Sequence, residues 1–202
     1  DDVINAYLPG MGTTWGISLA GLTANYDLGY SDAADFFFQV VFVATAMSIV
    51  SGAVAERMRL IPFFIFAVVM TGFIYPVQGY WKWGGGWLDA IGYTDFAGSG
   101  VVHLCGASAA LAAVLILGAR SGKYGADGSV TVMRGSNIPI AALGAFILWL
   151  GWFGFNGGSQ LAVHTVDNAN AVAQVFLNTN AAAAGGVLGA IIISKILTGK
   201  MD

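Results

Sequence analysis

Hydrophobic and polar positions alternate along this chain in long blocks. Five blocks of apolar and small residues lie between polar loops, and each is close to the length of about 20 residues that a helix needs to cross the hydrocarbon core of a bilayer. They cover residues 33–55, 61–81, 97–118, 138–156 and 169–194. The pattern predicts five membrane-spanning helices, which places the two ends of the chain on opposite sides of the membrane.

Composition agrees with this pattern and excludes several classes of function. The chain is 57% apolar and only 9% charged, whereas about a quarter of the residues in a soluble domain are charged. The net charge of −3 and the lack of basic runs argue against a nucleic-acid partner. No nucleophile lies beside a base and no span holds a carboxylate pair, so we expect no enzyme. No cluster of metal-ligating residues is evident, so we expect no metal and no cofactor.

The first 32 residues differ from the spans because they mix glycine, proline and polar residues. We interpret 1–32 as an extracytoplasmic loop, with a short re-entrant or interfacial turn within 3–31. The membrane domain then covers 33–196, and 197–202 begin a cytoplasmic loop. The chain reads as a piece of a larger protein.

Positive charges in the loops predict the orientation. Lys82 stands among aspartates, whereas the other basic residues fall in alternate loops, and by the positive-inside bias those loops are cytoplasmic. The basic residues of these loops are Arg57, Arg59, Arg120, Lys123, Arg134, Lys195 and Lys200. The beginning of the chain therefore lies outside the cell membrane and its end inside.

A histidine within the third span is the first candidate for function. A titratable side chain inside a membrane span is costly and is therefore a functional candidate. Helical spacing from His103 reaches Gly106 and Ala110, so the imidazole stands on a stripe with almost no side chains. Such a stripe can line a narrow path or allow another helix to approach closely.

Five strings carry a family resemblance, and they occur in the family's order. They are FFFQVVFVATAMSIVSGAVAER, WGGGW, DFAGSGVVH, GWFGFNGGS and NTNAAAAGG. Together they resemble the ammonium transporter family. The resemblance implies an all-α, polytopic helix bundle in the cell (inner) membrane, with five of eleven helices present here, the third to the seventh. It also implies a homotrimer with one conduction path per protomer, and a PII-type regulatory protein as a possible partner.

The resemblance assigns aromatic residues to an outer vestibule that binds ammonium. Trp83 and Phe42 match its aromatic faces, which attract a cation by about 0.5 to 2 kcal/mol, and Ser159 supplies a hydroxyl. Phe155 matches a second phenylalanine that, with Phe42, gates the path, and Phe38 matches a neighbouring aromatic. From position alone, Trp83 is equally an interfacial tryptophan and Phe42 a core residue.

Two further residues match the family's path. His103 matches the first of two pore histidines, whose partner is not in this chain, because His164 falls in an outer loop. Its structural alternative is a histidine that packs helices and bonds to a backbone carbonyl. Asp95 begins the third span as an N-cap candidate. The matching aspartate shapes the site, and direct contact with ammonium is the alternative. Val40 and Cys105 depart from the family pattern, which bears on pore width.

The function implied is transport of ammonium or ammonia across the membrane. Burying a bare ammonium costs several kcal/mol even after relaxation, whereas removing its proton at neutral pH costs about 3 kcal/mol, so an apolar pore favours passage of ammonia. An ammonium sensor that binds without conducting, coupled to a cytoplasmic signalling domain, would have the same vestibule. A weaker alternative is a relative that passes another small neutral gas.

Overall fold

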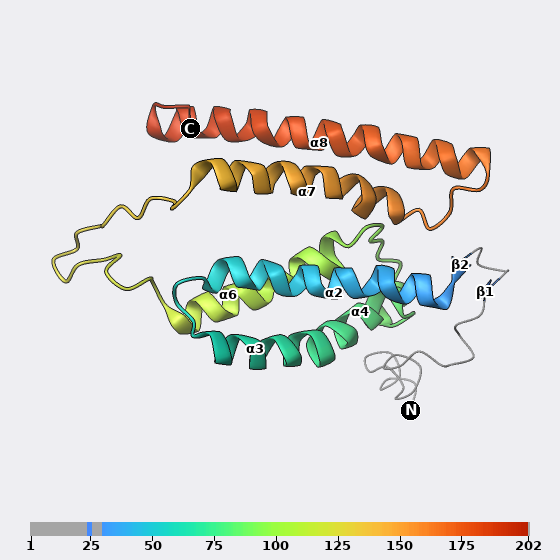
Figure 1. Cartoon of the computed structure of the whole chain (residues 1–202), viewed down its shortest axis with the longest axis horizontal. Coiled ribbons are helices and arrows are strands. Elements are labelled where there is room, and N and C mark those ends of the chain that lie inside the picture. The colour runs from blue at the N-terminus through green and yellow to red at the C-terminus, as the bar shows by residue number, and fades with distance from the viewer. Residues whose placement is uncertain (1–23, 26–29, 202) are drawn as a thin grey trace. The chain divides into compact units, whose positions relative to one another are not determined.

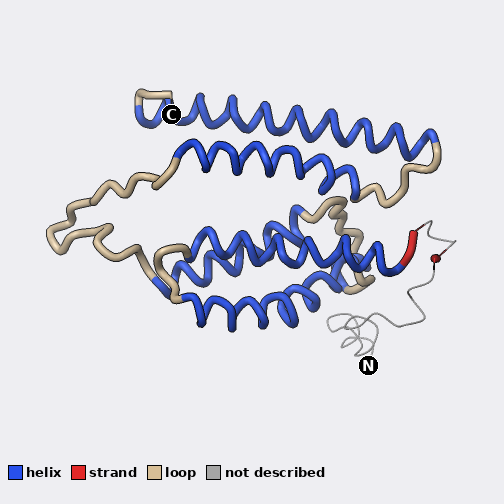
Figure 2. Tube along the Cα trace, viewed as in Figure 1, coloured by secondary structure: helices blue, strands red, loops and turns tan. Residues whose placement is uncertain are grey.

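The computed structural model describes residues 24–25 and 30–201, and the described residues are mainly helical (Figure 2). The predicted turn within 3–31 falls largely outside the described residues; of that stretch the structure describes β1 (Ala24–Asn25) and β2 (Tyr30–Ser31), which pair antiparallel. The chain forms two compact units, Asp1–Arg134 and Gly135–Asp202, which are described separately.

The first unit contains the first three predicted spans, and two of them include a π-helical segment. Its helices are α2 (Asp32–Val54), α3 (Leu60–Val69), η2 (Met70–Ile74), α4 (Tyr75–Trp83), α5 (Trp87–Ala90), η3 (Ser99–Leu104) and α6 (Cys105–Leu117). The segments α3, η2 and α4 form one span, as do η3 and α6. The apolar blocks predict the spans, but not the wider turns within them.

The second unit is a pair of helices joined by a short loop (Figure 1). These are α7 (Ile138–Gly158) and α8 (Val166–Thr198). The side chain of Asn137 caps α7, and that of Thr165 caps α8 by accepting from the backbone N–H of Asn168. This cap adds a turn before the predicted start of the fifth span, so α8 is longer than the apolar block alone indicates.

All five predicted spans are present as helices. Five helical segments among the described residues are long and apolar enough to cross a membrane. The structure therefore confirms the prediction of an all-α, polytopic membrane helix bundle.

The small-residue stripe of the third span packs against α2, which lies beside α6 (Figure 1). A Cβ atom added to Gly106 would lie 2.6 Å from the backbone oxygen of Ala46 and 3.0 Å from the side chain of Ile49. Ala46 is fully buried and Ala110 is 8% exposed. Of the two roles predicted for the stripe, Gly106 and Ala110 therefore serve close helix packing.

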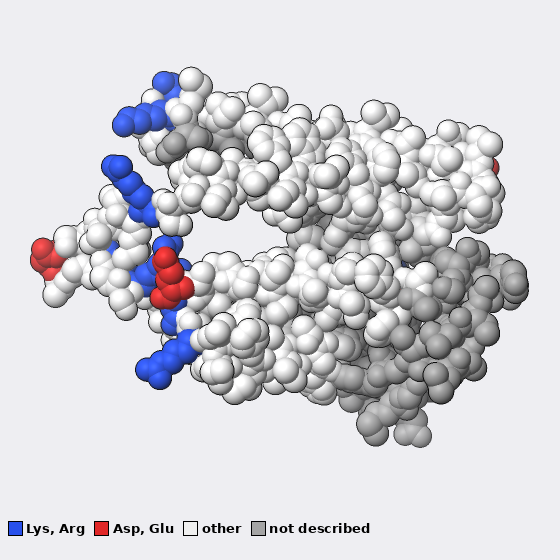
Figure 3. Space-filling view, viewed as in Figure 1, with Lys and Arg blue, Asp and Glu red and all other residues white. Residues whose placement is uncertain are grey.

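Loop charges of the first unit meet at one end of its helices (Figure 3). Arg57, after α2, donates to the backbone oxygen of Gly118 at 2.9 Å. Arg120, after α6, pairs with Glu56 at 2.7 Å. The two loops predicted to share a side of the membrane thus touch each other.

Candidate functional site

Aromatic side chains from two spans meet in the first unit. Phe42 on α2 is 2% exposed, and its ring centroid lies 5.9 Å from that of Trp83 at the end of α4. Phe38, one turn before Phe42, contacts it edge to face at 4.5 Å. Three of the residues assigned to the vestibule therefore form one continuous cluster.

The carboxylate of Asp95 organises the start of the third span. Its Oδ1 atom accepts from the backbone N–H groups of Gly98 and Ser99, each at 2.9 Å. Its Oδ2 atom accepts from those of Gly100 at 2.9 Å and Val101 at 2.7 Å. Free N–H groups and the positive end of the helix dipole favour a carboxylate at this point. Because both oxygens are engaged, the geometry favours a scaffold role over direct contact with a cation.

Asp95 performs the predicted capping from a different position than expected. The residue at the N-cap is Gly98, whose φ of 100° lies in the left-handed region that favours glycine. Asp95 stands three residues earlier, and the chain turns at Gly98 so that the carboxylate reaches the N–H groups. The prediction of the capping contact is confirmed, and the prediction of the N-cap position is wrong.

A hydrogen bond ties the aromatic cluster to this cap. The indole Nε1 of Trp83 donates to the backbone oxygen of Asp95 at 3.0 Å. Such a bond fixes the plane of the indole relative to the start of the third span. The ring of Trp83 is therefore held by the fold, not left to rotate at a membrane interface.

His103 lies on the π-helical turn that follows the cap. Its Nδ1 atom is 3.3 Å from the backbone oxygen of Gly98, and its backbone N–H donates to the same oxygen at 3.0 Å. If Nδ1 carries the proton, Nε2 is the acceptor nitrogen of the neutral ring. The side chain is half-buried.

The second unit carries the other two predicted site residues. Ser159 is the C-cap of α7, and its hydroxyl donates to the backbone oxygen of Phe155 at 2.8 Å. The ring of Phe155 stacks on that of Trp152 at 5.8 Å. Phe155 and Ser159 thus share one turn of helix.

Two of the quoted strings contact each other in this unit. Asn156, in GWFGFNGGS, donates its side-chain amide to the hydroxyl of Thr179, in NTNAAAAGG, at 3.0 Å. Thr179 is 8% exposed, and the rings of Phe153 and Phe176 meet edge to face at 5.4 Å nearby. The strings are therefore adjacent in space although 23 residues separate the bonded pair.

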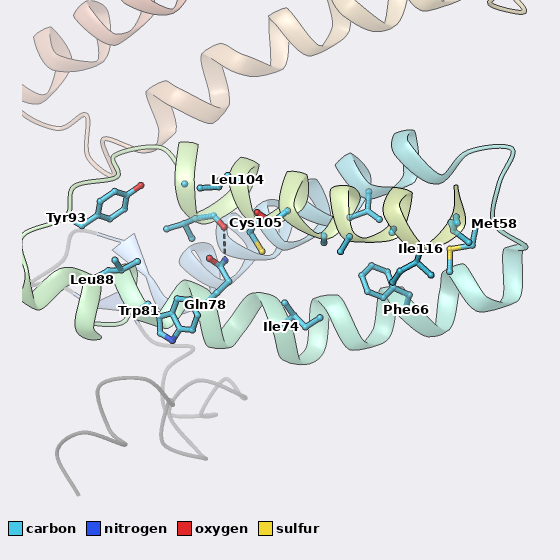
Figure 4. Close-up of a pocket in the computed structure, with 18 residues that line it drawn as sticks. Met58, Phe66, Ile74, Gln78, Trp81, Leu88, Tyr93, Leu104, Cys105 and Ile116 are labelled. Atoms are coloured by element: carbon cyan, nitrogen blue, oxygen red, sulfur yellow. Dashed lines mark hydrogen bonds between the residues drawn. The ribbon is translucent and has the colours of Figure 1, made fainter. Parts of the chain in front are cut away.

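An apolar groove lies between the second and third spans of the first unit (Figure 4). It has a volume of about 740 Å³, and its lining includes Phe66, Ile74, Leu104 and Cys105. Among the described residues, those that line this groove do not include His103. The groove is therefore a separate feature from the surroundings of the histidine. Cys105 faces the groove, consistent with its expected role as a small apolar side chain.

One polar residue of this region was overlooked in the sequence. Gln78 on α4 lines the groove and donates to the backbone oxygen of Val101 at 2.7 Å. The signal was available, because a polar side chain inside an apolar span is a functional candidate by default. Among the described residues, no group of three His, Cys, Asp or Glu side chains could hold a metal ion.

Comparison with known proteins gives a consistent result. The model of the Ammonium Transporter Family matches residues 6–202. The chain is 44% identical over 203 residues to ammonium transporter Amt2 of Archaeoglobus fulgidus, covering 96% of this chain and 42% of that protein. It is also 44% identical over 194 residues to the putative ammonium transporter sll1017 of Synechocystis, covering 95% of this chain and 44% of that protein. The chain thus spans less than half the length of these relatives.

Solved structures resemble the fold as well. The crystal structure of the N240A mutant of Candida albicans Mep2 matches with a TM-score of 0.73 and 34% identity, covering 85% of this chain and 37% of that chain. Saccharomyces cerevisiae Mep2 matches with a TM-score of 0.72 and 29% identity, at the same coverage.

Proposed function

The chain belongs to the ammonium transporter family, and from this premise we propose that it forms the recruiting half of a path that carries ammonium or ammonia across a membrane. It is a multi-pass membrane protein of a transporter family, not an enzyme. The observation that carries the proposal is the connection of Phe42 and Trp83, through Asp95, to the turn that holds His103. The ring contact of Phe42 with Trp83 and the hydrogen bonds of Trp83, Asp95 and His103 then link the aromatic faces, the cap and the imidazole.

Recruitment takes place at the aromatic cluster. Phe42 and Trp83 attract the cation with about 0.5 to 2 kcal/mol, the larger value where water is displaced. The hydroxyl of Ser159 donates its hydrogen to Phe155, which leaves its oxygen lone pairs able to accept an ammonium N–H. The family resemblance assigns Phe42 and Phe155 to the gate of this path.

The path then selects by proton loss. A bare ammonium in an apolar pore costs several kcal/mol, whereas deprotonation near neutral pH costs about 3 kcal/mol. K⁺ and Na⁺ have no proton to lose, so the same pore excludes them. His103 hydrogen-bonds the neutral molecule or carries the proton separately. A second imidazole would come from a helix beyond this chain, since His164 is exposed in the loop between α7 and α8.

Orientation and assembly follow the family. The loops that hold Arg57 and Arg120 face the cytoplasm, by the positive-inside bias, and the cluster around Trp83 faces outward. In this arrangement 33–196 are part of the membrane domain, flanked by the loops 1–32 and 197–202. The complete protein is a homotrimer in the cell membrane, with its cytoplasmic face available to a PII-type regulator.

Ammonium-evoked current in proteoliposomes tests the proposal. The complete natural protein is compared with His103→Ala, and with His164→Ala as a matched control in an exposed loop. We expect a saturable current that His103→Ala reduces and His164→Ala leaves unchanged. Passage of neutral ammonia gives no current and is followed as a pH change inside the vesicles, compared with protein-free vesicles. Ammonium binding with neither current nor such a pH change would overturn transport and support the sensor instead. Equal passage of another neutral gas, without saturation by ammonium, would favour the third alternative.

A further inference from the structure

Gln78 places a primary amide in an otherwise apolar part of the second span, and this amide reaches the third span. Its Nε2 atom donates to the backbone oxygen of Val101 at 2.7 Å, across 23 positions of sequence. Figure 4 shows the side chain directed from α4 toward the helix that carries Leu104 and Cys105. Val101 is 3% exposed. Gln78 is half-buried beside an apolar groove, and an amide removed from water is costly unless it is hydrogen-bonded, so this bond favours one direction of the side chain.

The acceptor belongs to the π-helical turn that carries His103. The wider winding is visible in the bonds from the backbone N–H of His103 to the oxygen of Gly98, and from that of Cys105 to the oxygen of Gly100. Single π turns inside α-helices occur often at functional sites. Returning such a turn to α winding would rotate the side chains that follow it about the helix axis. The direction of the imidazole therefore depends on this turn remaining π-helical.

Several contacts hold the turn, and α4 supplies one directly and one through Asp95. Asp95 binds the N–H groups at its start. Gln78 binds the oxygen of Val101, two residues before His103. Trp83, five residues after Gln78 on the same helix, binds the backbone oxygen of Asp95. The helix that presents the aromatic face thus bonds to the turn directly at Val101, and indirectly through Asp95.

We propose that Gln78 is a positioning residue for His103. It holds the π-helical turn at Val101 so that the imidazole keeps its direction relative to Trp83. This inference rests on the proposed function, because it gives the turn a role in conduction. Gln78 itself does not contact the transported molecule in this mechanism.

The test uses the complete natural protein in proteoliposomes, with ammonium chloride as the probe. Gln78→Leu removes the donor at similar volume. Thr71→Val is the matched control, since it removes a side-chain bond to a backbone oxygen, that of Ala67, on the same span away from the π-helical turn of the third span. Maximum current and half-saturating concentration are measured per reconstituted protein. We expect Gln78→Leu to lower the maximum current about tenfold with little change in half-saturation, because the aromatic cluster is intact, and Thr71→Val to resemble wild type.

A second variant gives a readout that folding alone would not move. In Gln78→Glu only the protonated carboxyl has an O–H to donate to Val101. Its current relative to wild type should rise reversibly as one preparation is taken from about pH 8 to about pH 5, toward the ordinary glutamate pKa of about 4.3. Dividing by the wild-type current cancels the titration of Asp95, His103 and the tyrosines, which both proteins share.

The outcomes separate the two proposals. If wild type shows neither a saturable current nor an ammonia-driven pH change inside the vesicles beyond that of protein-free vesicles, the proposed function fails before Gln78 is tested. If wild type conducts and Gln78→Leu matches Thr71→Val, positioning by Gln78 is refuted. If Gln78→Leu does not reach the membrane, the pH series of Gln78→Glu decides, and a ratio that stays flat with pH refutes the inference.

Discussion

Replacing Asp95 with alanine removes the acceptor for four backbone N–H groups at once. The four bonds measure 2.9, 2.9, 2.9 and 2.7 Å. An ordinary N-cap deletion costs about 0.5–2 kcal/mol, and a buried donor left without a partner costs about 1–3 kcal/mol. Ser99 is exposed and water can serve its N–H, whereas Val101 is buried. We therefore expect a local loss of about 3 kcal/mol or more, equal to about two powers of ten in an equilibrium constant.

The measurement combines ammonium-evoked current with thermal unfolding of the complete natural protein. Asp89→Ala is the matched control, because Asp89 lies in the short helix α5 that precedes Asp95 and pairs with Lys82 near the surface. An exposed ion pair of that kind contributes about 0–1 kcal/mol. We expect Asp95→Ala to lose current and to unfold at lower temperature, and Asp89→Ala to change little. A direct cation contact by Asp95 would instead raise the half-saturating concentration while the unfolding temperature stays fixed.

Unchanged current and unfolding temperature in Asp95→Ala would refute the capping argument. An equal loss of current and stability in Asp89→Ala would also refute it, because the effect would then come from removing a negative charge in this region and not from losing the four N–H bonds. A loss of current without loss of stability would leave Asp95 with a functional role other than the scaffold described here.

Three further predictions test other contacts. Gly106→Val should destabilise the packing of α2 on α6 by about 1–3 kcal/mol, measured by thermal unfolding beside Gly52→Val, where a Cβ meets nothing within 4 Å; equal losses would contradict the close-approach reading. A double-mutant cycle with Asn156→Leu and Thr179→Val should give a coupling of about 0.6 kcal/mol, and zero coupling would mean that their 3.0 Å bond does not stabilise the pair. Hydrogen bonds from Ser129 lower the pKa of Asp127 from the ordinary 3.8. The exposed turn should therefore be stabilised above pH 3.8 and lose this contribution as pH falls through the lowered pKa. An amide chemical shift of this turn that titrates at pH 3.8 or higher would contradict the prediction.

Much of the fold could be predicted because a membrane span is a local property. Each of the five apolar blocks is long enough to span hydrocarbon, and within it the backbone can satisfy its own polar groups only as a helix. The small stripe at Gly106 predicted either a narrow path or close helix packing, since a missing side chain is visible in the sequence, and the structure shows close packing. The capping contact of Asp95 was also predicted, because carboxylates are favoured before exposed N–H groups.

Contacts between spans could not be read from the sequence. The bond from Gln78 to Val101 depends on the angle and height at which helices dock, which no helical period encodes. The pairing of Phe42 with Trp83 was expected only from the family resemblance, for the same reason. The π-helical turn at His103 was missed for a related reason: its sequence is ordinary, and bonds from other segments hold it. The sequence by itself therefore determined the membrane spans, the family and the set of candidate site residues. Only the tertiary structure decided which of these residues are linked by hydrogen bonds and ring contacts, because side-chain direction is set by contacts between segments far apart in the chain.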